Sequence, residues 1–83
     1  MNTITLLNST VKSETEKAFL IEMFTLEGNI TFWVPKSQVK STNEKNIEVA
    51  SWLSKNAYEA YCKKFMVSPI IATSSISKFI KSN

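Results

Sequence analysis

The sequence predicts a single α+β domain of 83 residues, built from a small curved antiparallel sheet and one main helix. Two β-prone runs, 17–26 and 30–34, lie on either side of the only glycine in the chain, as the arms of a β-hairpin would. The stretch 51–65 instead repeats its apolar residues at helical spacing. We therefore expect about four or five strands, with a partly open barrel as one form of the sheet, packed against the helix.

The N-terminal residues predict a short β element. Residues 3–7 are β-prone, Asn8-Ser9 is a turn signal and Val11 follows, so the segment is either one bent strand or a small hairpin arm. Residues 13–16 are polar and carry no apolar period, which indicates a loop before the next element.

The first arm of the predicted hairpin is apolar on both faces except at Glu22. One face carries Phe19, Ile21 and Met23, and the other carries Leu20, Phe24 and Leu26. A helix is the rival interpretation of such a run. The compact turn signal at 27–29, followed by a second β-prone run, favours the hairpin.

The second arm alternates between two kinds of residue. Ile30, Phe32 and Val34 are expected to face the core, while Trp33 points the other way, and Pro35 ends the strand because it lacks a ladder donor.

The segments that follow lead into the helix. Residues 36–39 predict a tight turn or a single helical turn, residues 41–45 a solvated loop, and residues 46–50 a short strand.

Ser51 is the predicted N-cap of the main helix, which runs to about Phe65. Its apolar stripe consists of Leu53, Ala57, Ala60, Tyr61 and Phe65. Lys63 and Lys64 fall in the last turn, where positive charge complements the helix dipole. The sequence thus divides into a domain at 1–66 and a C-terminal tail at 67–83.

The tail begins after the helix break at Ser68-Pro69. Ile76, Phe79 and Ile80 have the i, i+3, i+4 spacing of a short amphipathic helix, which Ser74 or Ser75 could cap. Three interpretations stay open for this segment: a lid on the core, a disordered end, or a partner-binding element.

The residue inventory excludes most catalytic and metal sites. The chain has no His, no Asp and no Arg, and Cys62 is its only thiol. These absences rule out Ser-His and Cys-His pairs, tetrahedral zinc sites and an internal disulfide. A pair of Glu residues is the one remaining acid/base option, and the seven Glu are scattered over polar or helical positions. We expect no enzyme, no catalytic residue, no metal and no cofactor.

The expected cellular location and the net charge narrow the class of protein further. No signal peptide follows Met1 and no apolar run approaches the roughly 20 residues of a membrane span, so we expect a cytoplasmic protein without a membrane partner. The net charge of +3 comes from ten Lys and seven Glu. It is compatible with nucleic-acid binding and also with a merely solvated Lys surface.

Three segments resemble one group of small proteins encoded by bacteriophages and prophages. They read K-A-F-L-I-E-M, F-W-V-P-K-S-Q-V and I-E-V-A-S-W-L, and they lie between Thr10 and Lys55. The resemblance, centred on the W-(I/V)-P-K-S-Q-(I/V) segment, implies a phage origin and a place among phage genes for DNA metabolism. The chain departs from that pattern at Ala50, where relatives usually have Pro, and in the tail from Val67.

The first functional hypothesis is binding of nucleic acid, with single-stranded DNA favoured. Trp33, with Phe32 or Tyr58, would stack on bases, and lysines along the rim would contact phosphates. The candidate surface residues are Trp33, Lys36, Gln38, Lys40 and Lys45.

Two alternatives involve protein partners. One is a phage protein that binds and inhibits a host defence complex, such as an anti-CRISPR or nuclease inhibitor, or that serves the phage replisome. In that case the tail residues Ile76, Phe79 and Ile80 are candidate contacts. The other is a homo-oligomer formed by pairing of exposed strand edges.

Overall fold

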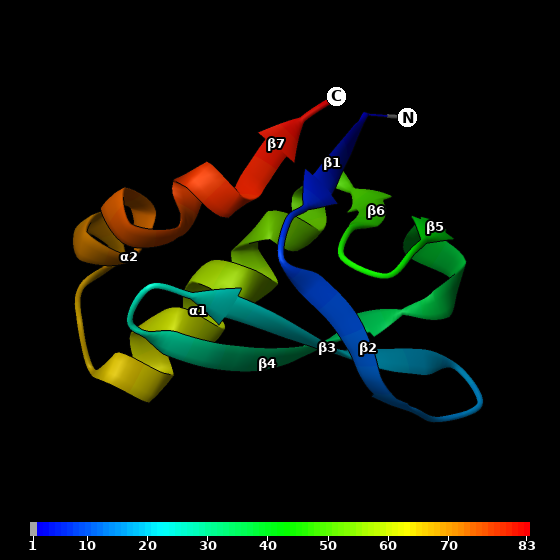
Figure 1. The fold of residues 1–83 in the computed structure, drawn as a ribbon, viewed down its shortest axis with the longest axis horizontal. Coiled ribbons are helices and arrows are strands. Elements are labelled where there is room, and N and C mark those ends of the chain that lie inside the picture. Colours follow the sequence, from blue (N-terminus) through cyan, green and yellow to red (C-terminus); the bar gives the residue numbers. More distant parts are fainter. Residues whose placement is uncertain (1) are drawn as a thin grey trace.

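The computed structural model describes residues 2–83 and confirms the predicted α+β class (Figure 1). The strands are β1 (Thr3–Leu6), β2 (Ser9–Glu14), β3 (Ala18–Thr25), β4 (Gly28–Pro35), β5 (Val39–Thr42), β6 (Ile47–Ala50) and β7 (Ile80–Ser82). The helices are α1 (Ser54–Phe65) and α2 (Pro69–Ile76). Short 3-10 turns lie at Lys36–Gln38, Ser51–Leu53 and Ser77–Phe79.

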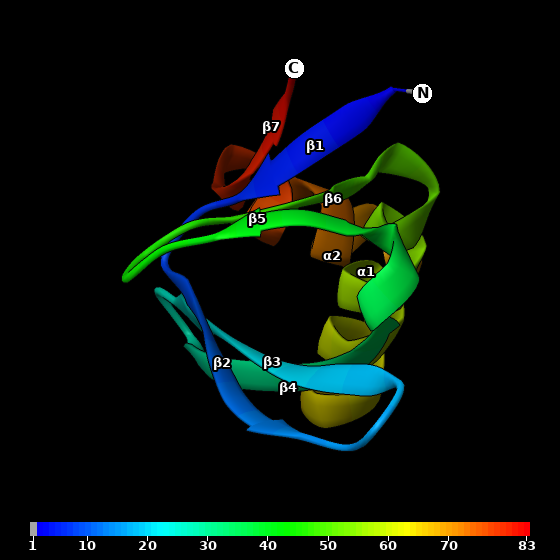
Figure 2. The same ribbon diagram turned by 90° about the vertical axis from the view of Figure 1, so that its right-hand side faces the viewer.

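The strands form two antiparallel sheets that face each other, with the helices along one side (Figure 2). One sheet has the order β5-β6-β1-β7 and the other the order β2-β3-β4. The described residues thus form seven strands in two sheets, rather than four or five in one, and the sheets do not close into a barrel.

The division into two sheets begins at Asn8. This residue has a φ of 51°, in the left-handed region that Asn tolerates better than most side chains. The turn changes the direction of the chain, so that β1 pairs with β6 in one sheet and β2 pairs with β3 in the other. Of the two forms expected for this segment, the single bent element is closer to the structure, although its two halves belong to different sheets.

The hairpin of β3 and β4 confirms the strand interpretation of the long apolar run. Its turn lies at Leu26-Glu27, one residue earlier than predicted, because Thr25 already pairs with Gly28. Gly28 has a φ of 140°, and a Cβ atom there would lie 3.4 Å from the ring of Phe65. That distance is an ordinary van der Waals contact, so it is the backbone conformation that favours glycine at this position.

The core lies between the sheets and under the helices. The alternation predicted for β4 is confirmed, since Ile30, Phe32 and Val34 are buried. The remaining buried apolar residues come from every layer: Ile4, Leu6, Ile21, Met23, Ile47, Val49, Ala50, Leu53, Ala57, Tyr61, Ala72 and Ile76.

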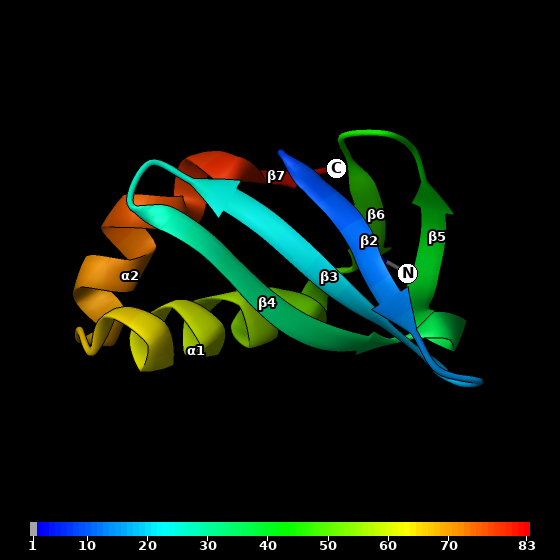
Figure 3. The ribbon, with the colours of Figure 1, turned by 60° about the horizontal axis from the view of Figure 1, so that its bottom comes forward.

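Helix α1 runs along the free edge of β4 (Figure 3). The side-chain amide of Asn56 donates to the carbonyl of Trp33 at 3.0 Å, and the Lys64 ammonium donates to the carbonyl of Asn29. These side chains satisfy edge carbonyls that no strand reaches. The helix therefore protects this edge from pairing with another chain.

The helix begins later than predicted and ends where predicted. Ser51 starts a 3-10 turn and makes no capping bond with its side chain, so α1 itself starts at Ser54. The helix ends at Phe65, and Met66 follows in the left-handed conformation with a φ of 53°.

The segment 67–83 packs against the rest of the domain and contains a short helix, which was one of the forms expected for it. The helix lies earlier than predicted, because Pro69 occupies its first turn and the Ser68 hydroxyl accepts a hydrogen bond from the Ile71 amide at 3.4 Å. The last strand, β7, pairs with β1 and brings the two ends of the chain together (Figure 1). Of the three interpretations of the tail, a lid on the core is the nearest.

Candidate functional site

Two half-exposed tryptophans lie on either side of one groove. Trp33 is 48% exposed and Trp52 is 51% exposed. The groove between them has a volume of about 440 Å³. We call it the tryptophan groove, and it is lined by Lys17, Ala18, Trp33, Val34, Pro35, Trp52, Leu53 and Asn56.

Local structure explains why both rings face outward. Trp33 lies between Phe32 and Val34, which point into the core, so strand alternation places its side chain on the opposite face. Trp52 lies in the 3-10 turn before α1, where the adjacent Leu53 takes the buried position. The packing of α1 along β4 then brings the two residues to one groove.

The charges at the tryptophan groove are positive. Lys17 lines it directly, and the Lys55 ammonium lies 5.8 Å from the centre of the Trp52 ring, within the range of a cation–π interaction. Glu59 does not line this groove; it lies further along α1.

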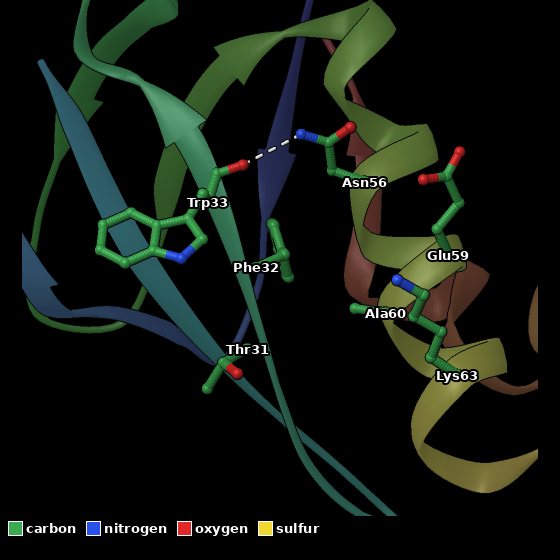
Figure 4. Close-up of a pocket in the computed structure, with 7 residues that line it drawn as sticks. All are labelled: Thr31, Phe32, Trp33, Asn56, Glu59, Ala60 and Lys63. Carbon is green, nitrogen blue, oxygen red and sulfur yellow. Dashed lines mark hydrogen bonds between the residues drawn. The ribbon is translucent and has the colours of Figure 1, made fainter.

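A second groove of about 310 Å³ lies between β4 and α1 (Figure 4). Figure 4 shows the indole of Trp33 turned away from α1, while Glu59 and Lys63 project from the helix on the opposite wall. The Glu59 carboxylate and the Lys63 ammonium have opposite charges, so this groove does not favour a ligand of either charge. The hydrogen bond from Asn56 to the Trp33 carbonyl joins the two walls and holds the backbone of Trp33 in place.

The residues predicted for the surface do not gather around Trp33. Lys36 is only partly exposed: its ammonium lies 2.5 Å from a Glu14 carboxylate oxygen and 5.0 Å from the centre of the Phe19 ring. Gln38 is half-buried in the 3-10 turn, and Lys40 is exposed on β5.

Lys45 lies in the connection between β5 and β6, and its carbonyl accepts a hydrogen bond from the Ser9 amide at 2.7 Å. Figure 2 shows this connection on the side of the molecule away from α1. The structure therefore separates Lys45 from the tryptophan groove and places Lys17 and Lys55 there instead.

The three predicted contact residues of the C-terminal segment face inward. Ile76 is fully buried, and Phe79 and Ile80 pack partly buried against the core. In this fold, the exposed apolar residues of the segment are Ile70 and Ile71.

Sequence reasoning missed Trp52, Lys17 and Lys55. A signal for Trp52 was present, since a tryptophan adjacent to the apolar stripe of a helix lies at the border between core and solvent. Lys55 also had a local signal, because it follows Trp52 by three residues at the start of the predicted helix. Lys17 had none, because the pairing of Ala18 with Pro35 in the β3–β4 hairpin places it at the groove.

Residues 2–83 contain no group of three or more metal-ligating side chains, and Cys62 is a half-buried free thiol. Within the same residues, neither helix is long and apolar enough to span a bilayer. No family model, curated protein or solved structure matches the chain. The resemblance to phage and prophage proteins therefore stays a prediction from the motifs.

Proposed function

We propose that this chain is a small non-enzymatic phage protein that acts in phage DNA metabolism by binding single-stranded DNA at the tryptophan groove. The observation that supports it best is the pair of half-exposed indoles, Trp33 and Trp52, on one groove. Buried tryptophans would need no further explanation in so small a domain, whereas two exposed ones at the same groove suggest a ligand with flat aromatic groups.

Stacking supplies the main binding energy in this proposal. A base that stacks on an aromatic side chain contributes roughly 1–3 kcal/mol, and every base has a face that can stack. Two rings can therefore hold a single strand with little preference for sequence. A duplex would not expose its base faces in the same way.

Lys17 and Lys55 provide the phosphate contacts. Both lie beside the indoles, so a strand whose bases stack on Trp33 and Trp52 passes close to their ammonium groups. With so few cations at the groove, we expect a moderate affinity that decreases with salt.

The test is a titration of the protein with short single-stranded oligonucleotides at low salt, followed by tryptophan fluorescence and by anisotropy of a labelled strand. Trp33→Ala and Trp52→Ala are each expected to weaken binding roughly 5- to 150-fold, the equivalent of about 1–3 kcal/mol. Phe24→Ala is the matched control, because Phe24 is an aromatic residue that is 50% exposed and does not line the groove. The absence of both binding and a fluorescence change at low salt would reject the proposal.

A second candidate is binding to a host defence complex, as an inhibitor of the anti-CRISPR or nuclease-inhibitor type. The accessible apolar lining of the groove, which includes Ala18 and Pro35 beside the two tryptophans, favours it because it suits a protein side chain as well as a base. Immobilised protein would be incubated with purified nuclease or effector complexes. Retention that Trp52→Ala abolishes, together with no oligonucleotide binding, would support this candidate over the first.

A further inference from the structure

A second exposed apolar surface lies at the end of α1. Met66 is 91% exposed, Ile70 80% and Leu26 75%. With Ile71, which is 50% exposed, these residues form what we call the apolar end.

Contacts along the chain show that the apolar end is one region. The β3–β4 turn, which carries Leu26, lies against the end of α1: the Tyr61 hydroxyl donates to Glu27 at 3.0 Å, and the Phe65 ring approaches Gly28. Met66 follows Phe65 directly, and α2 packs against α1. Figures 1 and 3 both place this turn and α2 at the same end of the molecule.

Helix α2 is uncharged on its outer face as well as its inner one. No charged residue lies between Lys64 and Lys78. The inner face packs against the core, where Ala72 and Ile76 are fully buried. Ile70 and Ile71, on the other side, face solvent. The outer face also exposes Thr73 and Ser74, so it is partly polar but carries no charge, and the first turn of α2 presents two isoleucines to solvent.

Met66 adds an independent observation. It follows the last turn of α1 in the left-handed conformation, with a φ of 53°, a position where glycine is strongly preferred. Its side chain is almost fully exposed, so burial does not compensate for the unfavourable backbone conformation. Neither backbone preference nor packing within one chain explains a methionine here, whereas an intermolecular contact does, since methionine adapts well to contact surfaces.

We propose that the apolar end is the interface of a homodimer, with a second copy of this chain as its occupant. The net charge of +3 opposes self-association weakly, and the uncharged apolar end is where two copies can meet without repulsion. Glu27, in the turn next to Leu26, and Lys63, in the last turn of α1, have opposite charges, so a two-fold arrangement can pair them across the interface.

The size of the surface also suits this occupant. A biological interface should bury at least about 1,000 Å² in total, or about 500 Å² on each copy, which is roughly a tenth of the 5052 Å² surface. Four large side chains exposed by half or more supply apolar area on the order of 400 Å², to which the rim adds.

The proposed interface leaves the tryptophan groove open. Trp52 precedes α1 and Met66 follows it, so the helix separates the two surfaces by its 12 residues, about 18 Å. Where the proposed DNA binding also holds, a dimer has two grooves for one strand and gains affinity by avidity. The dimer itself does not depend on that function.

The test is sedimentation equilibrium of the full chain over a wide range of concentrations. The mass is expected to rise from 9.4 kDa toward twice that value as the concentration increases. Ile70→Lys is expected to raise the dimer dissociation constant at least about tenfold. Thr42→Lys is the matched control: it adds the same charge at an exposed position on β5 and should change the constant less than about twofold.

Met66→Gly is the second variant, and it keeps the test independent of misfolding. Glycine suits the left-handed backbone, so the variant should fold at least as well while it loses the methionine contact. It is expected to raise the dissociation constant roughly fivefold or more. A chain that stays at 9.4 kDa at every concentration, or a dimer that both variants leave unchanged, would overturn the proposal.

Discussion

Ile76 and Ile70 lie on the same short helix and offer a direct test of how the C-terminal segment contributes to stability. Ile76 is fully buried and Ile70 is 80% exposed. Replacing isoleucine by alanine removes roughly three methylene equivalents, each contributing about 0.8 kcal/mol when buried. With the added cost of the cavity, Ile76→Ala is expected to lower the free energy of unfolding by about 3–4 kcal/mol.

Ile70→Ala makes the same chemical change on the solvent side of α2. It should change the free energy of unfolding by less than about 0.5 kcal/mol at a protein concentration where the chain is monomeric. Comparing the two variants therefore separates the effect of burial on the free energy of unfolding from the effects of helix propensity and of the side-chain atoms removed.

The measurement is urea denaturation of both variants and the parent, with the free energies compared at equal slope. A total stability of about 5–15 kcal/mol makes a loss of 3–4 kcal/mol easy to detect. A loss below about 1 kcal/mol for Ile76→Ala, or equal losses for the two variants, would show that α2 is not packed on the core as described.

Three further predictions concern other parts of the molecule. Met66→Gly should stabilise the monomer by roughly 0.5–1 kcal/mol in urea denaturation, because it relieves a left-handed conformation; a destabilised monomer would contradict this. Asn56→Ala should cost about 1 kcal/mol, since the Trp33 carbonyl loses its donor, and an unchanged midpoint would show that the hydrogen bond contributes nothing. For DNA binding, Lys17→Gln should reduce the slope of log K against log salt by about 0.7, whereas Lys36→Gln should leave it unchanged because Lys36 is already paired with a carboxylate; equal slopes for the two variants would refute the placement of the phosphate contacts.

The central hairpin could be predicted because its signals are local. Period-two alternation in β4 specifies which residues face the core, and a glycine marks the turn between two β-prone runs. The helical spacing of 51–65 is equally local, and the structure ends α1 at Phe65 as expected. The exposure of Trp33 follows from the same alternation.

The C-terminal segment could not be predicted in the same way. Residues 80–82 carry no strand signal of their own, and they become a strand because β1 offers its edge, with the Asn83 amide bonded to the Thr3 carbonyl at 3.1 Å. Contacts between the two ends of a chain leave no period in the sequence. The apparent helical spacing of Ile76, Phe79 and Ile80 reflects their shared contact with the core rather than one continuous helix.

The neighbours of surface side chains could not be predicted from the sequence for the same reason. Sequence alone determined the α+β class of the fold and the two faces of β4. Only the tertiary structure decided that Glu14 pairs with Lys36, and that Trp52 and Lys17 line one groove with Trp33. The physical reason is that side-chain alternation is set within one strand, whereas a groove is set by which elements pack beside it.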